Sequence, residues 1–352
     1  MKKISLLFVL MLSSIISFAQ GGLGAATIEF DEGKFADAKR HIDEASVHAK
    51  AALKSKTWFY RGQIYAAIAS DSKISSLDPN AANVAYDAYK KAMDMEPAKG
   101  GYYKDAEAGM SRMYEVFINQ GGGFFETKPD PDFKSAMKAF EKAQTLKPND
   151  TTAYVYAAIA AAQIKDFEGY TRNIEPVLSM ASAKLSSKIE HYPNVIAHYI
   201  ETKNLPKALK IAEMASKDFP KNIQFVTYEA YLNQEMDNMP RALELYNKIS
   251  NIAPNSTDGA RGLGAYYFEL ARKEGNKEDK ERTDKTITPA KSAEYDKKIR
   301  ASLLLAIPHL EKVAAGNPKD LDILNTLVQC YQNTDNKTKL AETNKKIDAL
   351  KK

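Results

Sequence analysis

Histidines are the residues in this chain best suited to chemistry, and their spacing decides what they could do. Five histidines are present, and two pairs, His41 with His48 and His191 with His198, are seven residues apart. A seven-residue step places two side chains on one face of a helix, where they could share a metal ion. No cysteine or acidic residue stands at the spacing from these histidines that a metal-binding motif requires, and the HExxH motif is absent. The sequence therefore predicts no metal site and no catalytic histidine.

A glycine-rich stretch, Gly259-x-x-Gly262-x-Gly264, superficially resembles a phosphate-binding loop. It lacks the Gly-Lys-Ser/Thr ending and follows no predicted strand, so it fails the context that the motif needs. We interpret Gly264 as a residue that lets two helices pack closely and Gly259 as part of a turn. No Gly-x-Ser-x-Gly nucleophile elbow is present. We therefore expect no catalytic residue, no cofactor and no enzymatic activity.

Helices are the elements available to position side chains, and one pattern marks five of them. In each copy an alanine is followed by residues four, seven and twelve positions later, and the last is proline. The first two steps place three side chains on one helix face, and the proline ends the helix. The copies are Ala85-Tyr89-Ala92-Pro97, Ala136-Phe140-Ala143-Pro148, Ala208-Ala212-Ala215-Pro220, Ala242-Tyr246-Ile249-Pro254 and Ala306-Leu310-Val313-Pro318.

Each marked helix is expected to be the second of a pair whose first helix carries an aromatic, a small residue and a tyrosine. Trp58-x-x-x-Gly62-x-x-Tyr65 fits this best. These residues resemble those that mark the tetratricopeptide repeat family, from about Phe35 to the C-terminus. The resemblance implies an all-α fold, a right-handed α-solenoid of tetratricopeptide-type helix pairs, with Trp58 in its core.

The register of the repeats predicts two sub-arrays. Pro220 and Pro254 are 34 residues apart, the period of a tetratricopeptide helix pair. The register is broken around Ser179–Ser187, where we expect a bend. We therefore predict an N-terminal sub-array over 20–180 and a C-terminal sub-array over 181–352, each stabilised by contacts between neighbouring repeats.

Three insertions separate first from second helices, two in the N-terminal sub-array and one in the other. They are Ser70–Asn83, the glycine-rich Asn119–Asp132, and a highly charged stretch at 272–298 that we expect to be disordered. Insertions in repeat arrays form loops on one face, which is often used for binding. The aromatic pair Phe124 and Phe125 is therefore expected in a loop that either contacts a partner or is solvated and partly disordered.

The first 19 residues have the organisation of a secretory signal. Lys2 and Lys3 precede an apolar stretch, and small residues before Gln20 offer a cleavage site. The stretch is short for a transmembrane helix, although an uncleaved anchor is the alternative. The chain resembles exported tetratricopeptide proteins of the Bacteroidetes. We expect a periplasmic protein without a transmembrane segment after cleavage, with secretion or outer-membrane association as the alternative.

The charge and the cysteine content of the chain indicate which kinds of partner and which cysteine chemistry are not expected. Lysine and arginine total 50 against 45 acidic residues, interspersed along the chain, so no basic stripe for nucleic acid is expected. Cys330 is the only cysteine, which rules out an internal disulfide. Beside Leu327 and Tyr331 it is expected to be a buried, unreactive thiol, the alternative being a reactive or intermolecular one.

The resemblance implies binding through a concave groove lined by the first helices. Family members that bind chaperones use a lysine and an asparagine there to clamp a carboxylate, and this chain lacks that clamp. We expect a non-enzymatic scaffold of the bacterial cell envelope that binds a protein segment through the groove or the loops. The alternatives are a secreted or surface solenoid that binds glycans or peptides, and an enzyme within a helical toroid. The candidate partner-binding residues are Phe59, Gln63, Phe124, Phe125, Val155, Ile159, Tyr231, Gln234, Asn325 and Gln329.

Overall fold

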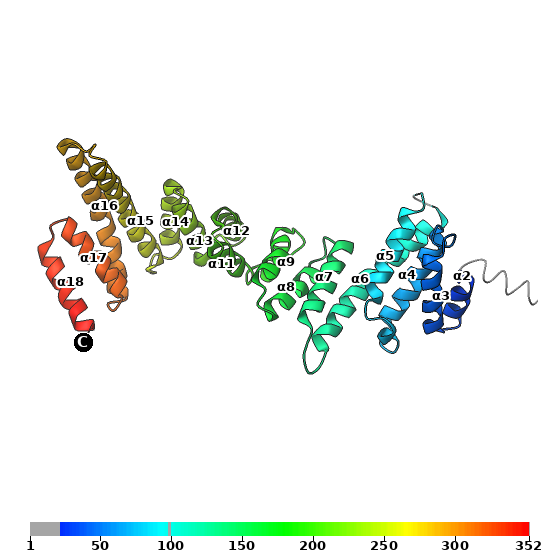
Figure 1. The fold of residues 1–352 in the computed structure, drawn as a ribbon. Coiled ribbons are helices and arrows are strands. Elements are labelled where there is room, and N and C mark those ends of the chain that lie inside the picture. Colours follow the sequence, from blue (N-terminus) through cyan, green and yellow to red (C-terminus); the bar gives the residue numbers. More distant parts are fainter. Residues whose placement is uncertain (1–21, 98–99, 352) are drawn as a thin grey trace, which may run out of the picture. The chain divides into compact units, whose positions relative to one another are not determined.

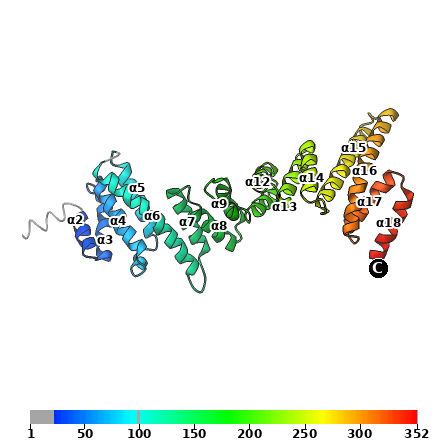
Figure 2. The same cartoon turned by 180° about the vertical axis from the view of Figure 1, so that it is seen from behind.

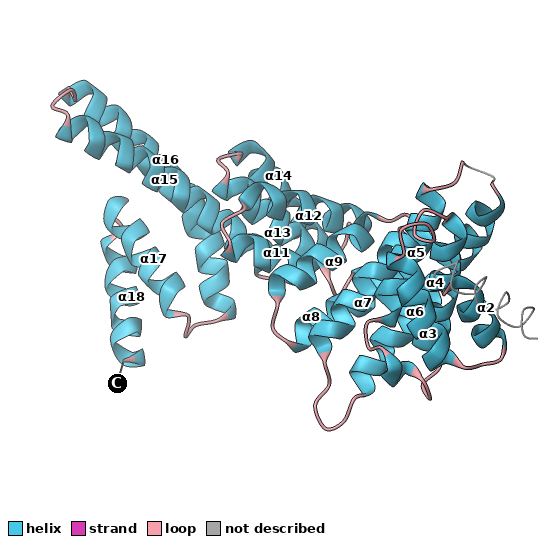
Figure 3. Cartoon of the chain, turned by 45° about the vertical axis from the view of Figure 1, so that its right-hand side comes forward, coloured by secondary structure: helices cyan, strands magenta, loops and turns pink. Residues whose placement is uncertain are grey.

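The computed structural model describes residues 22–97 and 100–351, and all the regular structure in them is helical (Figure 3). The predicted signal, residues 1–19, lies outside the described residues. The elements are α2 (Leu23–Asp31), α3 (Phe35–Val47), α4 (Ser55–Ser70), the 3-10 turn η1 (Ser75–Leu77), α5 (Ala81–Asp94), α6 (Gly101–Glu126), α7 (Phe133–Leu146), α8 (Thr151–Gln163), α9 (Phe167–Ser179), α10 (Leu185–Lys188), α11 (Tyr192–Glu201), α12 (Leu205–Asp218), α13 (Ile223–Glu235), α14 (Met239–Ile252), α15 (Asp258–Thr283), α16 (Pro289–Gly316), α17 (Leu321–Asn333) and α18 (Lys337–Leu350).

Consecutive helices pack as pairs within two compact units, Met1–Lys184 and Leu185–Lys352. The first unit contains the pairs α2–α3, α4–α5, α6–α7 and α8–α9 (Figure 1). The second contains α11–α12, α13–α14, α15–α16 and α17–α18 (Figure 2). We call the members of each pair its first and second helix. The expected all-α solenoid of helix pairs is confirmed.

The five helices marked by the alanine–proline pattern are all second helices, namely α5, α7, α12, α14 and α16. Every residue on their predicted faces is buried, with at most 5 % of its surface exposed. Each helix ends two or three residues before its proline. The pattern therefore predicted both the buried face and the end of each helix correctly.

Tyr89 of α5 shows why small residues are needed on the neighbouring first helices. A Cβ atom on Gly62 of α4 would lie 2.5 Å from the Tyr89 ring, and one on Gly109 of α6 would lie equally close. Carbon atoms cannot approach so closely, so the ring fits only because both positions are glycine. Tyr89 is 4 % exposed. An aromatic ring of one second helix is thus packed between the first helices of two successive pairs.

The second predicted loop, Asn119–Asp132, is largely helix, so that prediction is wrong. The helix α6 continues to Glu126, and the Phe124–Phe125 pair lies in its last turn. The reason is Gly121, whose missing Cβ would stand 2.5 Å from the ring of Phe140 in α7. Glycine here serves close packing between helices, as Gly62 and Gly109 do, and does not mark a turn.

The charged stretch 272–298, expected to be disordered, is also helical. The helices α15 and α16 run through it and leave only 284–288 between them. Opposite charges join the two helices, because Lys291 Nζ lies 2.5 Å from a Glu281 oxygen that also accepts the Tyr295 hydroxyl at 3.0 Å. Even these long helices are too polar to cross a membrane, and no other described helix is long and apolar enough to do so.

Trp58, expected in the core, is only partly buried. Its ring lies under the Lys91 ammonium at 3.6 Å, and its indole N–H donates to the Ala52 carbonyl at 2.8 Å. The core position belongs to the next residue, Phe59, which is 8 % exposed and lies 5.4 Å from the Tyr102 ring. The burial of Phe59 also removes it from the candidate partner-binding surface.

Cys330 is completely buried in α17, as expected. Burial raises the pKa of its thiol to about 12. Because the thiolate is the nucleophile, the folded protein is expected to react negligibly with dithionitrobenzoate near neutral pH and stoichiometrically in guanidinium. The absorbance of the released thionitrobenzoate measures both. Rapid labelling of the native protein would contradict the burial of this side chain.

Candidate functional site

The histidines are engaged in local contacts. His41 Nδ1 lies 2.6 Å from a carboxylate oxygen of Glu29, and His48 Nδ1 accepts the backbone N–H of Ala51 at 3.3 Å. Within residues 22–97 and 100–351, no three histidine, cysteine or acidic side chains are grouped so that they could hold a metal ion.

The glycine-rich stretch belongs to α15 and packs on the helices beside it. A Cβ on Gly262 would lie 2.2 Å from the Tyr246 ring, and one on Gly264 would lie 2.7 Å from a side chain of α16. The interpretation of Gly264 as a close-packing residue is confirmed. Gly259 is helical and lies against Ser250, so its assignment to a turn is wrong.

The first unit contains an open groove between α6 and α8, which we call the first-helix groove. Its volume is about 520 Å³, and the ring of Phe140 on α7 forms its floor. The other side chains and backbone positions that line it come from two first helices and are Ile118, Asn119, Gly122, Gly123, Phe125 and Glu126 of α6 with Tyr156 and Ile159 of α8.

Aromatic rings run continuously across this groove. The Phe125 ring lies 5.1 Å from Phe133 and 5.9 Å from Phe140, and Phe140 lies 5.3 Å from Tyr156. At the far end Tyr156 is 44 % exposed and Ile159 is 39 % exposed. The inner rings are therefore fixed by packing, while the last two side chains present apolar surface to solvent.

Glycine shapes the opposite wall. A Cβ on Gly122 or Gly123 would meet no atom within 4 Å, so both positions face open space. Bare backbone in the last turns of α6 lets a ligand approach the helix closely. Asn119 and Glu126 supply polar groups at the edge of the groove. The arrangement suits an apolar side chain of a ligand, held between ring faces and helix backbone.

The structure brings together only part of the predicted set. Phe125 and Ile159 line the first-helix groove, and Val155 lies half-buried one helical turn before Ile159. Phe124 points to a different groove, described below. Elsewhere in the chain, Gln63 is half-buried in α4, Tyr231 and Gln234 lie in α13, and Asn325 and Gln329 are exposed on α17.

Gln234 forms a hydrogen bond within the fold: its side-chain oxygen accepts the Tyr246 hydroxyl at 3.2 Å.

Tyr156 and the two glycines of the groove were not predicted as site residues. Tyr156 stands three residues before Ile159, a step that places both on one helix face, and this signal was available in the sequence. Gly122 and Gly123 could not be separated from Gly121 by residue type alone. Only the packing of α6 on α7 shows that one glycine is covered by a ring and the next two are not.

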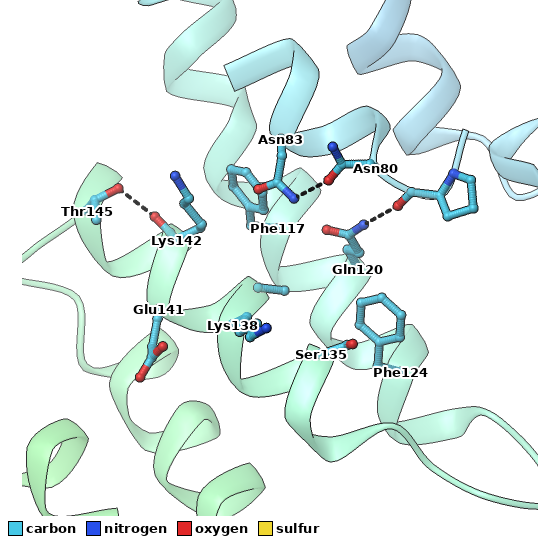
Figure 4. Close-up of a pocket in the computed structure, with 12 residues that line it drawn as sticks. Asn80, Asn83, Phe117, Gln120, Phe124, Ser135, Lys138, Glu141, Lys142 and Thr145 are labelled. Atoms are coloured by element: carbon cyan, nitrogen blue, oxygen red, sulfur yellow. Dashed lines mark hydrogen bonds between the residues drawn. The ribbon is translucent and has the colours of Figure 1, made fainter. Parts of the chain in front are cut away.

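A second groove of about 520 Å³ lies between the second helices α5 and α7, over α6, and we call it the second-helix groove (Figure 4). Phe117, Phe124 and Ala139 form its apolar part. The rest of its lining comes from Pro79 and from the polar residues Asn80, Asn83, Gln120, Ser135, Lys138, Glu141, Lys142 and Thr145. The two grooves therefore use different helices and different chemistry.

No family model and no curated protein matches the sequence. Among solved structures, a tetratricopeptide repeat protein of Bacteroides fragilis NCTC 9343 is similar, at 17 % identity and a TM-score of 0.38, covering 62 % of this chain and 98 % of that one. The C-terminal part of a repeat protein from Cytophaga hutchinsonii has 14 % identity, coverages of 87 % and 99 % and a TM-score of 0.37. A tetratricopeptide repeat protein of Parabacteroides merdae ATCC 43184 has 14 % identity, coverages of 81 % and 93 % and a TM-score of 0.34.

Proposed function

We propose that this chain is a non-enzymatic, protein-binding scaffold of the tetratricopeptide type. In this proposal the first-helix groove holds an extended or helical segment of a partner protein. The observation that carries it is the apolar surface of Tyr156 and Ile159, which are 44 % and 39 % exposed at the end of an open groove. Exposed apolar surface gathered in a groove is typical of interaction sites.

The groove is suited to one apolar anchor rather than to a flat contact. Tyr156 offers its exposed ring on one side, and Gly122 offers bare helix backbone on the other. A leucine, methionine or aromatic side chain inserted between them would lose its hydration while the surrounding residues exclude water. The polar edge at Asn119 and Glu126 would then hydrogen-bond to the backbone of the partner segment.

We further propose that the scaffold acts in the bacterial cell envelope, after export to the periplasm. The support is the arrangement of the first 19 residues, with Lys2 and Lys3 before an apolar stretch and a small-residue site before Gln20. The mass of the protein isolated from native cells tests this. A periplasmic fraction with a mature N-terminus at Gln20 is expected, and a cytoplasmic protein that retains Met1 would contradict it.

Site-specific photocrosslinking tests the binding role. Benzoylphenylalanine is placed at Tyr156 in the groove and, as a control, at Phe167, which is 62 % exposed and does not line it. Illumination of intact cells is expected to join a defined protein to the first position only. Equal yields of the same products at both positions would contradict a specific groove.

A further inference from the structure

The second-helix groove differs from the first-helix groove in its charge. Lys138 and Lys142 line it and stand four residues apart on α7, so their ammonium groups share one helix face. Lys142 lies 4.5 Å above the Tyr86 ring of α5. Neither lysine forms an ion pair with an acidic side chain among residues 22–97 and 100–351. Two like charges at this spacing repel one another, and no ion pair offsets that repulsion.

The acidic groups nearby are already occupied. Glu141 lines the groove, but its carboxylate lies 2.9 Å from Arg172 and also accepts the Asn173 amide at 3.2 Å. Figure 4 shows Glu141 directed away from the groove amides. Asp132, before α7, accepts the backbone N–H of Ser135 at 3.0 Å and caps the helix. Lys138 still attracts the Asp132 carboxylate from a distance. Among residues 22–97 and 100–351, however, neither carboxylate forms an ion pair with Lys138 or Lys142, so both ammonium groups remain available to an anionic ligand.

Amide groups add directional donors beside the lysines. Asn83 donates one N–H to Asn80 at 2.7 Å, and Gln120 donates one to the Pro79 carbonyl at 3.5 Å (Figure 4). Each primary amide has two N–H donors, so each retains one. These donors face the same space as the Lys138 and Lys142 ammonium groups. Ammonium and amide donors together are suited to carboxylates.

The floor of the groove is apolar, and this feature selects among anionic ligands. The Phe117 and Phe124 rings and the Ala139 methyl group lie below the polar groups. A bare inorganic anion would gain nothing from such a floor, whereas an acidic peptide with an apolar side chain would use both parts.

We propose that the second-helix groove is a docking site for an acidic protein segment that carries an apolar anchor residue. Its carboxylates bind Lys138 and Lys142, and its anchor packs on Phe124. This site is separate from the first-helix groove, so the chain would hold two partners, or two segments of one partner, at once.

A peptide array with the full mature chain measures the binding of acidic peptides directly. The probes are short random-sequence peptides, grouped by net charge and by aromatic content, and bound protein is quantified. Retention is expected to rise with negative charge and to rise further when an aromatic residue is present. The best acidic peptide is then titrated by fluorescence anisotropy at low salt and at about 0.15 M salt, where the Debye length is about 8 Å.

Lys138→Glu is expected to weaken the binding of that peptide by roughly tenfold or more, because an attraction between opposite charges becomes a repulsion between like charges. Lys104→Glu is the matched control, since Lys104 is exposed on α6 and does not line the groove. It makes the same change in net charge and should leave the affinity within about twofold, with unchanged circular dichroism for both variants. Ile159→Asp, in the other groove, should also bind the acidic peptide normally.

Three results would overturn the proposal. The first is equal affinity of the wild-type and Lys138→Glu proteins for the acidic peptide. The second is stronger binding of a single-stranded oligonucleotide, which would make the groove a nucleic-acid site. The third is a dimer in sedimentation analysis that Lys138→Glu dissolves, which would make a second copy of the chain the occupant. A failure of the first-helix groove to bind its partner leaves all three measurements interpretable.

Discussion

Tyr89→Ala is expected to destabilise the first unit by about 3–5 kcal/mol, the range for removing a large buried aromatic side chain. The ring is 4 % exposed and lies between Gly62 and Gly109, which have no side chains that could move into the space. The cavity would therefore stay open and separate two successive helix pairs. Denaturant unfolding followed by circular dichroism measures the loss.

Tyr89→Phe is the matched control, because it removes only the hydroxyl and keeps the ring in its slot. Its effect is expected to stay within about 1 kcal/mol. Hydrogen exchange adds a spatial test, since repeat arrays are stabilised mainly by contacts between neighbours. Protection should fall in α4, α5 and α6 and remain unchanged in α13 to α18. A uniform fall over the whole chain, or a loss below about 1 kcal/mol for Tyr89→Ala, would refute this packing role.

Two adjacent glycines of α6 are expected to respond to alanine in opposite directions. Gly121→Ala would place a Cβ 2.5 Å from the Phe140 ring and should cost about 1–3 kcal/mol through overpacking. Gly122→Ala meets no atom within 4 Å and should gain roughly 1 kcal/mol, because alanine favours a helix more than glycine does. The two variants should therefore differ by about 2–4 kcal/mol.

The comparison also tests whether this segment is helical at all. In the loop that the sequence predicted, neither substitution would meet a ring and neither would gain helix propensity. Both variants would then have nearly equal free energies of unfolding. Thermal unfolding of the two proteins side by side, with the wild-type protein, distinguishes the two structures.

The repeated alanine–proline pattern allowed five second helices to be predicted, with their buried faces and their ends. Such a prediction works because spacing and proline act locally, through helix geometry and the loss of a backbone donor. The errors arose where composition was used in place of contacts. Glycines near 121–123 suggested a loop, and charges at 272–298 suggested disorder, but both segments are helical, the first packed against a ring of α7 and the second joined by an ion pair between α15 and α16.

The prediction of binding-site residues has the same limit, because residue type and spacing do not give the contacts between helices. Phe125 and Ile159 were predicted and do meet in one groove, but Phe59, chosen by its place in the repeat, is buried. Repeat spacing predicts which face of a helix is buried only to within one residue. For that reason Trp58 was predicted in the core, whereas Phe59 occupies the core position. The second-helix groove was not predicted, because its lysines and amides lie on three consecutive helices, and only the packing of α5, α6 and α7 shows that they face one space.

Binding of the crosslinked partner to two matched variants tests the central claim, that the first-helix groove is the site of protein binding. Ile159→Asp places a charge in the groove, whereas Ile164→Asp makes the same change outside it, at a side chain that is 41 % exposed against 39 %. By calorimetry, the first variant is expected to bind the purified partner at least about tenfold more weakly than wild type. The second should bind within about twofold of it. Equal affinities for both variants and the wild-type protein would contradict the claim.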